Sequence, residues 1–284
     1  MRKKVLMVVK TYPTPSRNYG ETVCTAGIDI DTGEWVRIYP YPFRTAKDYS
    51  RFKKYETFEF NLVKSDARDK RPESFRLIET TSAQKISEAI PTKGNWEERL
   101  RYLLPTSFPS VQALQDQIYD ANADNFGRSL GLIQVRADSA EVTFEPDDRE
   151  WDDKQAKNLN KAKHDLENNL FLTPEQVETF KTLEKLPYKT RVSFDDMTGQ
   201  RHSLLVTDWE IGILFLKERK RLGEQKALEN VKYKIEQQIF AVTNDVFLII
   251  GSVFGHLKTD TVVVIGFVYP KKITKQEPAM DSLF

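Results

Sequence analysis

The stretch from Glu21 to Pro40, ETVCTAGIDIDTGEWVRIYP, decides the fold of the first part of the chain. Its first half, ETVCTAGIDI, predicts a strand. The segment from Asp31 to Glu34 predicts a turn, because Asp and Gly tolerate the backbone angles that turns require. The chain then returns through WVRIYPY as a second strand, so the whole stretch predicts a β-hairpin.

Further strands are predicted on both sides of this hairpin. KVLMVV, residues 4–9, is an apolar run bounded by the turn-like TYPTPSRNYG. YETFEFNLV, residues 55–63, alternates aromatic and polar residues as a half-buried strand does, and ESFRLIE follows as another strand. Several short strands joined by turns are typical of a small closed barrel. We therefore expect residues 1–81 to form an N-terminal barrel.

The rest of the chain divides into three parts. Residues 82–130 predict a helical bridge, with Asn95 and Ser110 as candidate caps of two short helices. Residues 131–270 predict a second β domain with inserted helices, one of them a long helix over residues 210–242. Residues 271–284 predict a flexible tail.

Composition limits the class of protein. The 284 residues are 39% hydrophobic and 11% aromatic, which is typical of a folded globular chain. The net charge is only +1, although the first 76 residues carry 16 Lys and Arg against 10 Asp and Glu. The single cysteine excludes an internal disulfide, and the three histidines lie far apart. We expect a cytoplasmic protein without a metal or a cofactor.

Several motifs together resemble the dual OB-containing domain family, a group of poorly characterised prokaryotic proteins. The resemblance begins with KTYPTPSRNYGETVCTAGI and GEWVRIYPYPFR, and it continues in RFKKYETFEF and RPESFR. Near the other end it includes Asp208–Glu210, the strand that ends at Gly251, and IGFVYP. The resemblance implies a β-rich α+β fold with two OB-like β-barrels and inserted helices, but it fixes no ligand.

OB barrels commonly bind single-stranded nucleic acid, stacking bases on aromatic rings while cations contact phosphates. Alternation along the strand places Trp35, Arg37 and Tyr39 on one face and Val36 and Ile38 on the other. We expect the first three to form an exposed stripe; the alternative is that the aromatic rings are packed and Arg37 pairs with an acidic residue. The candidate nucleic-acid-binding residues are Lys10, Tyr12, Arg17, Tyr19, Trp35, Arg37, Tyr39 and Arg44. The expected function is that of a non-catalytic accessory protein of a DNA-processing or defence system.

Two other functions stay open. Asp208 and Glu210 could share a magnesium ion in a nuclease, although Asp208 is also placed to cap the following helix. The C-terminal MDSLF resembles the pentapeptide that binds the bacterial sliding clamp, with Met280 in place of the usual glutamine. Leu283 and Phe284 would then be the apolar anchors of a protein-interaction adaptor. The lone Cys24 is interpreted as a packed small side chain.

Overall fold

The computed structural model describes residues 1–16, 20–41, 52–65, 69–78, 83–120, 125–167, 183–253 and 261–273. The predicted candidates Arg17, Tyr19 and Arg44, and the tail residues Met280, Leu283 and Phe284, lie outside these ranges.

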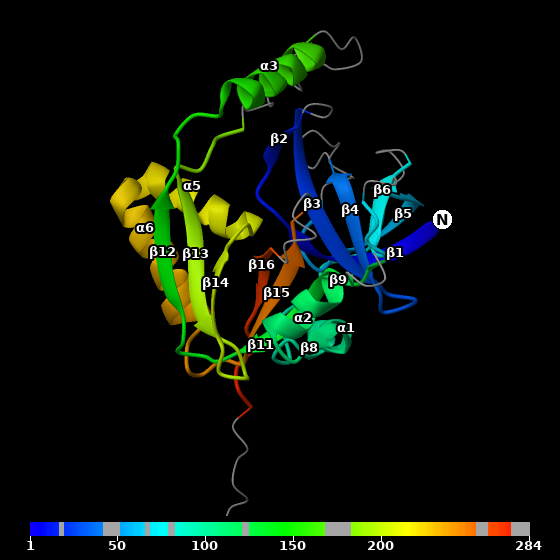
Figure 1. Ribbon diagram of the computed structural model, residues 1–284, viewed down its shortest axis with the longest axis vertical. Coiled ribbons are helices and arrows are strands. Elements are labelled where there is room, and N and C mark those ends of the chain that lie inside the picture. The colour runs from blue at the N-terminus through cyan, green and yellow to red at the C-terminus, as the bar shows by residue number, and fades with distance from the viewer. Residues whose placement is uncertain are drawn as a thin grey trace, which may run out of the picture.

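The N-terminal part forms a closed five-stranded barrel (Figure 1). Around the barrel the strands follow the order β1 (Arg2–Lys10), β3 (Gly20–Asp29), β4 (Trp35–Tyr41), β6 (Ser74–Leu77) and β5 (Thr57–Lys64). The barrel closes because β5 also pairs with β1. Neighbouring strands are antiparallel except β4 and β6, which are parallel. This arrangement confirms the predicted hairpin and the first predicted barrel.

The barrel interior is filled by apolar side chains that alternate along these strands. They include Val5, Met7, Val36, Ile38, Tyr41, Phe58, Phe60 and Leu62. Two short strands extend the sheet: β2 (Thr14–Ser16) pairs with β3, and β7 (Gln84–Ser87) pairs with β5. We call β1–β7 the first unit and the elements from β8 onward the second unit.

The second unit contains two sheets, whose strands pair antiparallel except for β8 and β11. One has the order β16 (Val262–Val268), β15 (Val246–Ser252), β11 (Leu130–Val135) and β8 (Ser107–Phe108). The other has the order β12 (Glu141–Pro146), β13 (Tyr188–Asp195) and β14 (Arg201–Leu205). Isolated bridges join Val135 to Asp196 and Val206 to Val264. Over the described ranges, isolated bridges rather than continuous strand pairing join these two sheets. The second closed barrel that the resemblance implies is therefore not observed there.

Helices lie outside the sheets, and one of them, over residues 153–167, contacts β2 and β3 of the first unit (Figure 1). The helices are α1 (Glu97–Leu103), α2 (Val111–Ile118), α3 (Asp153–Glu167), α5 (Trp209–Leu222) and α6 (Glu224–Tyr233), with short η3 (Leu104–Thr106) and a π-helical segment η4 (Lys234–Ile239). A small hairpin pairs β9 (Tyr119–Asp120) with β10 (Asn125–Phe126). No described helix has both the length and the apolar character that crossing a membrane requires.

Helix ends test three of the sequence predictions. The Ser110 hydroxyl accepts a hydrogen bond from the Ala113 amide at 3.1 Å, which confirms Ser110 as a cap. Asn95 is not a cap: its side chain instead exchanges two 2.6 Å hydrogen bonds with the backbone of Lys271. The single long helix is wrong, because Gly223 adopts φ 85° and ψ 169° and separates α5 from α6. Glycine reaches this conformation at far lower cost than other residues.

The two units share a hydrophobic core. The outer wall of the β3–β4 hairpin contributes Ala26, Ile28 and Trp35 to this core. The second unit contributes side chains from β11, β15 and β16, namely Leu130, Leu132, Phe247, Ile249, Val263, Ile265 and Val268. The wall of the barrel that faces outward on β3 and β4 is therefore covered by protein.

Candidate functional site

The predicted stripe on β4 is only partly at the surface. Val36 and Ile38 face the barrel interior as predicted, and Trp35 packs in the core between the units, outside the barrel. Trp35 and Arg37, however, are only 2% and 4% exposed, whereas Tyr39 is 37% exposed. The prediction of an exposed stripe is thus wrong at Trp35 and Arg37, because the sheet of the second unit covers that part of the strand.

Arg37 donates hydrogen bonds to neutral groups rather than to an acidic residue. Its Nη1 donates to the Cys24 Sγ at 3.2 Å, and its Nη2 donates to the Ser129 Oγ at 3.2 Å. Ser129 in turn donates from its backbone and its hydroxyl to Glu73. Cys24 is half-buried and serves as an acceptor for a guanidinium. This chain of hydrogen bonds connects β3, β4 and the segment before β6 to the start of β11.

A second buried arginine reinforces the same contact between the units. Arg71 forms two 2.7 Å hydrogen bonds with the carboxylate of Asp69. Its Nη1 also donates to the carbonyl and the hydroxyl of Ser252, at 3.3 and 3.2 Å. Arg71 therefore joins the first unit to the end of β15.

Lys10 is buried as well, so it is not the surface phosphate contact that the sequence predicts. It is 8% exposed, because Phe52 and the start of α5 cover it. Burial, together with the nearby Lys54 ammonium, lowers the pKa of Lys10 to about 8.

The Asp208 carboxylate caps α5. Its Oδ1 accepts hydrogen bonds from the backbone amides of Glu210 and Ile211, at 2.8 and 3.3 Å. Its Oδ2 contacts the Lys54 ammonium at 2.5 Å, and Glu210 contacts the same ammonium at 3.1 Å. Burial alone would lower the pKa of Lys54, but the two carboxylates outweigh it and raise that pKa. The Lys54 ammonium thus already pairs with both carboxylates of the nuclease alternative.

Metal-ligating side chains do not gather elsewhere in the described part of the chain. Within it, no three His, Cys, Asp or Glu side chains are arranged to hold a metal ion. The hairpin of β13 and β14 brings His202 to Asp196 at 2.9 Å, and this is a pairwise contact.

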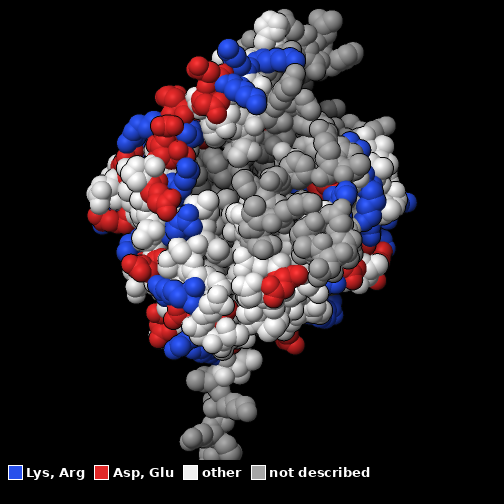
Figure 2. All heavy atoms as spheres, in the orientation of Figure 1, with Lys and Arg blue, Asp and Glu red and all other residues white. Residues whose placement is uncertain are grey.

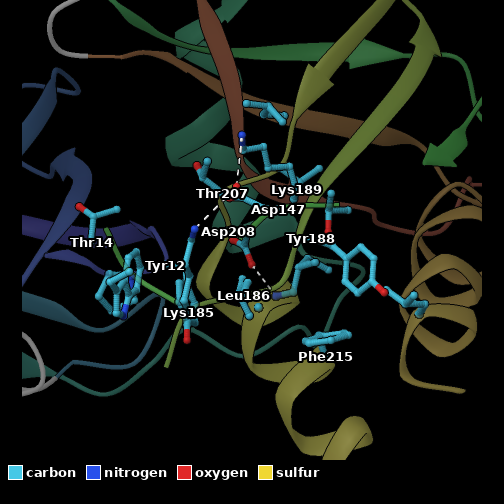
Figure 3. Close-up of a pocket in the computed structure, with 18 residues that line it drawn as sticks. Tyr12, Thr14, Asp147, Lys185, Leu186, Tyr188, Lys189, Thr207, Asp208 and Phe215 are labelled. Carbon is cyan, nitrogen blue, oxygen red and sulfur yellow. Dashed lines mark hydrogen bonds and ion pairs between the residues drawn. The ribbon is translucent and has the colours of Figure 1, made fainter. Parts of the chain in front are cut away.

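A groove of about 200 Å³ lies between the two units (Figure 3). Tyr12, just after β1, comes from the first unit. The second unit provides Trp151 before α3, Tyr188 at the start of β13 and Phe215 on α5. A concave site that is lined mainly by aromatic and aliphatic side chains, with a few polar groups, is the usual form of a ligand site.

The three polar rings of this groove are held by hydrogen bonds. The Tyr12 hydroxyl donates to the carbonyl of Glu184 at 2.8 Å, and the Trp151 Nε1 donates to the carbonyl of Leu183 at 2.9 Å. The Tyr188 hydroxyl donates to the Glu224 carboxylate at 2.9 Å. Because their polar ends are fixed, these rings form a preorganised wall.

Two lysines lie at the edge of the groove and share one carboxylate. Asp147 lies 3.6 Å from the Lys185 ammonium and 3.7 Å from the Lys189 ammonium. One negative charge between two positive charges leaves a local excess of +1. Elsewhere on the second unit, the visible surface over α5, α6 and β12 carries acidic and basic side chains intermixed (Figure 2). Attraction of an anion to this unit must therefore be local.

Among the described nucleic-acid-binding candidates, Tyr12 lines the groove and Tyr39 stays partly exposed on the barrel. Asp208, the candidate of the nuclease alternative, also lines the groove. Sequence reasoning missed Trp151, Lys185, Tyr188 and Lys189. A signal for three of them exists in KLPYK, residues 185–189, which interleaves basic and aromatic residues as the 35–44 stretch does. Trp151 stands in an acidic stretch, and nothing in that stretch indicates a binding role.

Gly212 on α5 is needed for the position of Tyr12. A Cβ at this glycine would lie 2.5 Å from Cδ2 of the Tyr12 ring. We expect Gly212→Val to lower the free energy of unfolding by about 1–3 kcal/mol, because Tyr12 must shift. Lys217→Val introduces the same side chain on the exposed side of the same helix and should cost less than about 1 kcal/mol. Urea denaturation measures both, and equal losses would show that Tyr12 is not held against Gly212.

Comparison with known proteins gives two family matches. Residues 1–105 match a domain of unknown function, DUF8758, and residues 107–284 match another, DUF8757. No curated protein matches the chain. Among solved structures, a murine DNA-binding protein bound to double-stranded DNA aligns over 98% of this chain and 99% of its own, with 11% identity and a TM-score of 0.30. So low a TM-score carries no argument about fold or function.

Proposed function

The chain belongs to the family of a domain of unknown function, DUF8757, and we propose, from the geometry of the groove, that it binds single-stranded nucleic acid without cleaving it. The observation that carries this proposal is the meeting of three partly exposed rings, Tyr12, Trp151 and Tyr188, beside Lys185 and Lys189. Aromatic rings stack on unpaired bases, and neighbouring lysines bind the phosphates of the same strand. A duplex keeps its bases stacked inside and offers only its backbone to such a groove.

The first barrel supports this proposal at the level of architecture. A closed five-stranded barrel is the architecture of OB folds, many of which bind oligonucleotides. In this protein the outer wall of β3 and β4 is covered, so we assign binding to the groove between the units rather than to that wall. An OB assignment for both units, and a role as a cytoplasmic accessory protein in prokaryotic DNA processing or defence, belong to the same proposal.

The ion pairs at the start of α5 favour binding over cleavage. The Lys54 ammonium contacts both Asp208 and Glu210, and the other Asp208 oxygen accepts the helix amides. The buried Asp208 carboxylate is thereby committed to the fold, and the exposed Glu210 carboxylate is paired with Lys54. A nuclease that uses them would have to replace Lys54 with its metal ion.

The test is fluorescence anisotropy with labelled single-stranded and duplex DNA and RNA, at low and moderate salt. We expect single strands to bind more tightly than duplexes. Lys185→Gln combined with Lys189→Gln should weaken single-strand binding about tenfold and reduce the slope of log K against log salt by about 1.4. That change in slope corresponds to the loss of two phosphate contacts.

The matched control is Lys226→Gln, which removes an exposed lysine that also pairs with a carboxylate, Glu229, outside the groove. It should leave affinity and salt slope nearly unchanged. A preference for duplex, or equal losses in the groove and control variants, would contradict binding in the groove. An absence of binding to every nucleic acid would overturn the proposed function.

A further inference from the structure

A second hollow, of about 570 Å³, lies where the chain leaves β16. Two half-buried rings, Trp96 and Tyr269, and two exposed lysines, Lys271 and Lys272, form much of its lining. The hollow shares no lining residue with the groove between the two units. It is therefore a separate candidate for a ligand site.

The two rings are held in place and still offer surface to the hollow. Their centroids lie 5.3 Å apart, and their planes are tilted by 53°. The Trp96 ring also packs against the Tyr55 ring at 6.2 Å, and the Arg99 guanidinium lies 4.9 Å from its centre. Neither Trp96 nor Tyr269 is fully buried. A planar ligand can stack on such rings without the cost of ordering them first.

The lysines around the hollow have no acidic partners. Lys234, whose ammonium lies 5.3 Å from the centre of the Tyr269 ring, and Lys271 donate hydrogen bonds to neutral oxygen atoms at 3.1–3.4 Å. Among the described residues, no carboxylate pairs with these two lysines or with Lys272, and none lines the hollow. The lysines of the groove, by contrast, share Asp147. Unpaired positive charge favours a phosphorylated ligand here.

The backbone beside the hollow is held in a strained conformation. Gly94, Asn95 and Trp96 have φ angles of 63°, 54° and 67°, in the left-handed region that residues other than glycine rarely adopt. The Asn95 side chain donates to the carbonyl of Lys271 and accepts from its amide, both at 2.6 Å. Strain of this kind persists only where the surroundings fix it, and it gathers at ligand sites. Here it fixes the Trp96 ring and the Lys271 backbone beside the same hollow.

Asn244 adds a buried acceptor to the lining. It is 1% exposed, and its Nδ2 donates to the carbonyls of Gln238 and Ile239, at 2.8 and 2.9 Å. Its Oδ1 has no hydrogen-bond partner among the described residues. Buried acceptors normally have a donor, and an amino group on a planar ligand, as in adenine or cytosine, is a suitable one.

We propose that this hollow binds a nucleotide, with the base stacked on Trp96 and Tyr269 and the phosphates bound by Lys271 and Lys272. Two sources carry this chemistry: a free nucleotide, and one nucleotide unit of a strand that also occupies the groove. The second source rests on the proposed function, whereas the first does not.

The test is isothermal titration calorimetry of the full chain with ATP, in buffer without divalent cations. We expect Lys271→Gln combined with Lys272→Gln to weaken ATP binding about tenfold, because charge-assisted contacts with the phosphates are lost. Tyr269→Leu should also weaken it about tenfold, through the loss of stacking on the base. Circular dichroism checks that both variants are folded.

Fragments of the probe test the two halves of the site. Adenosine carries only the base and sugar, and tripolyphosphate carries only the phosphates. Both should bind more weakly than ATP, because each makes one set of contacts. Tripolyphosphate that binds as tightly as ATP would contradict a nucleotide as the ligand.

The matched control is Lys217→Gln combined with Lys220→Gln. It removes two exposed lysines of α5 that do not line the hollow, so the change in net charge is the same. ATP affinity should stay nearly unchanged in this control and also in the groove variant, Lys185→Gln with Lys189→Gln. A loss in either pair as large as in the hollow variant would overturn the assignment of ATP to the hollow.

Fluorescence anisotropy with a single-stranded oligonucleotide then identifies the source. Unchanged strand affinity in Lys271→Gln with Lys272→Gln, together with weakened ATP binding, would identify a free nucleotide. A loss of strand affinity in that variant would identify the strand. Absence of ATP binding together with unchanged strand affinity would overturn the proposal. If the wild type binds no strand, the proposed function fails, but the ATP titration still decides this inference.

Discussion

Lys54→Met is expected to lower the free energy of unfolding by about 3–5 kcal/mol, because it leaves the buried carboxylate of Asp208 without its counter-ion. The Asp208 side chain is only 2% exposed, and its contact with Lys54 joins the first unit to the start of α5. Loss of one partner from a buried pair costs more than the pair itself contributes. Urea denaturation followed by circular dichroism measures the change.

Two further variants separate this effect from simple loss of a lysine. Lys226→Met breaks the exposed pair with Glu229, in which the side chains are 56% and 50% exposed, and should cost at most about 1 kcal/mol. Adding Asp208→Asn to Lys54→Met removes the stranded charge and keeps a good helix cap, so it should recover part of the loss. If Lys54→Met costs no more than Lys226→Met, the buried pair does not hold the units together.

Trp35→Ala should destabilise the protein by about 3–5 kcal/mol, the usual cost of removing a large aromatic ring from a core. The ring is buried between the barrel and the β11–β15–β16 sheet. Its loss would leave a cavity at the contact between the two units. The midpoint and the steepness of thermal unfolding report both the stability and the coupling of the units.

The matched control is Tyr39→Ala, four residues further along β4. Tyr39 is 37% exposed, and removal of its ring should change stability by about 0.5 kcal/mol. If Trp35 and Tyr39 both lay on an exposed stripe, the two substitutions would lower stability by small and similar amounts. Equal small losses at both positions would therefore contradict the packing of Trp35 between the units and restore the stripe predicted from the sequence.

Local features of the fold were predictable from the sequence. The β3–β4 hairpin follows from its turn residues, and the caps Ser110 and Asp208 follow from residue types at helix starts. Alternation along β4 also assigned Val36 and Ile38 to the barrel interior. Each of these depends on residues within a few positions of one another.

The strands that cover one face of β4 could not be predicted from the local sequence. Alternation gives the face on which Trp35 and Arg37 lie, but the cover comes from strands about 100–230 residues further along the chain. The groove is equally non-local, since Tyr12 meets Trp151 and Tyr188 only through the packing of the units. The break at Gly223 was missed because a single glycine within an amphipathic pattern is compatible with a continuous helix.

The covered wall of the barrel has a consequence for how the chain can be divided. The two matched families meet near residue 106, yet the apolar wall of β3 and β4 is buried only when both parts are present. A fragment that ends there would expose Ala26, Ile28 and Trp35 to water and would tend to self-associate. We therefore expect the barrel and its partner to unfold as one cooperative unit, so that the boundary between the two families is not a thermodynamic boundary.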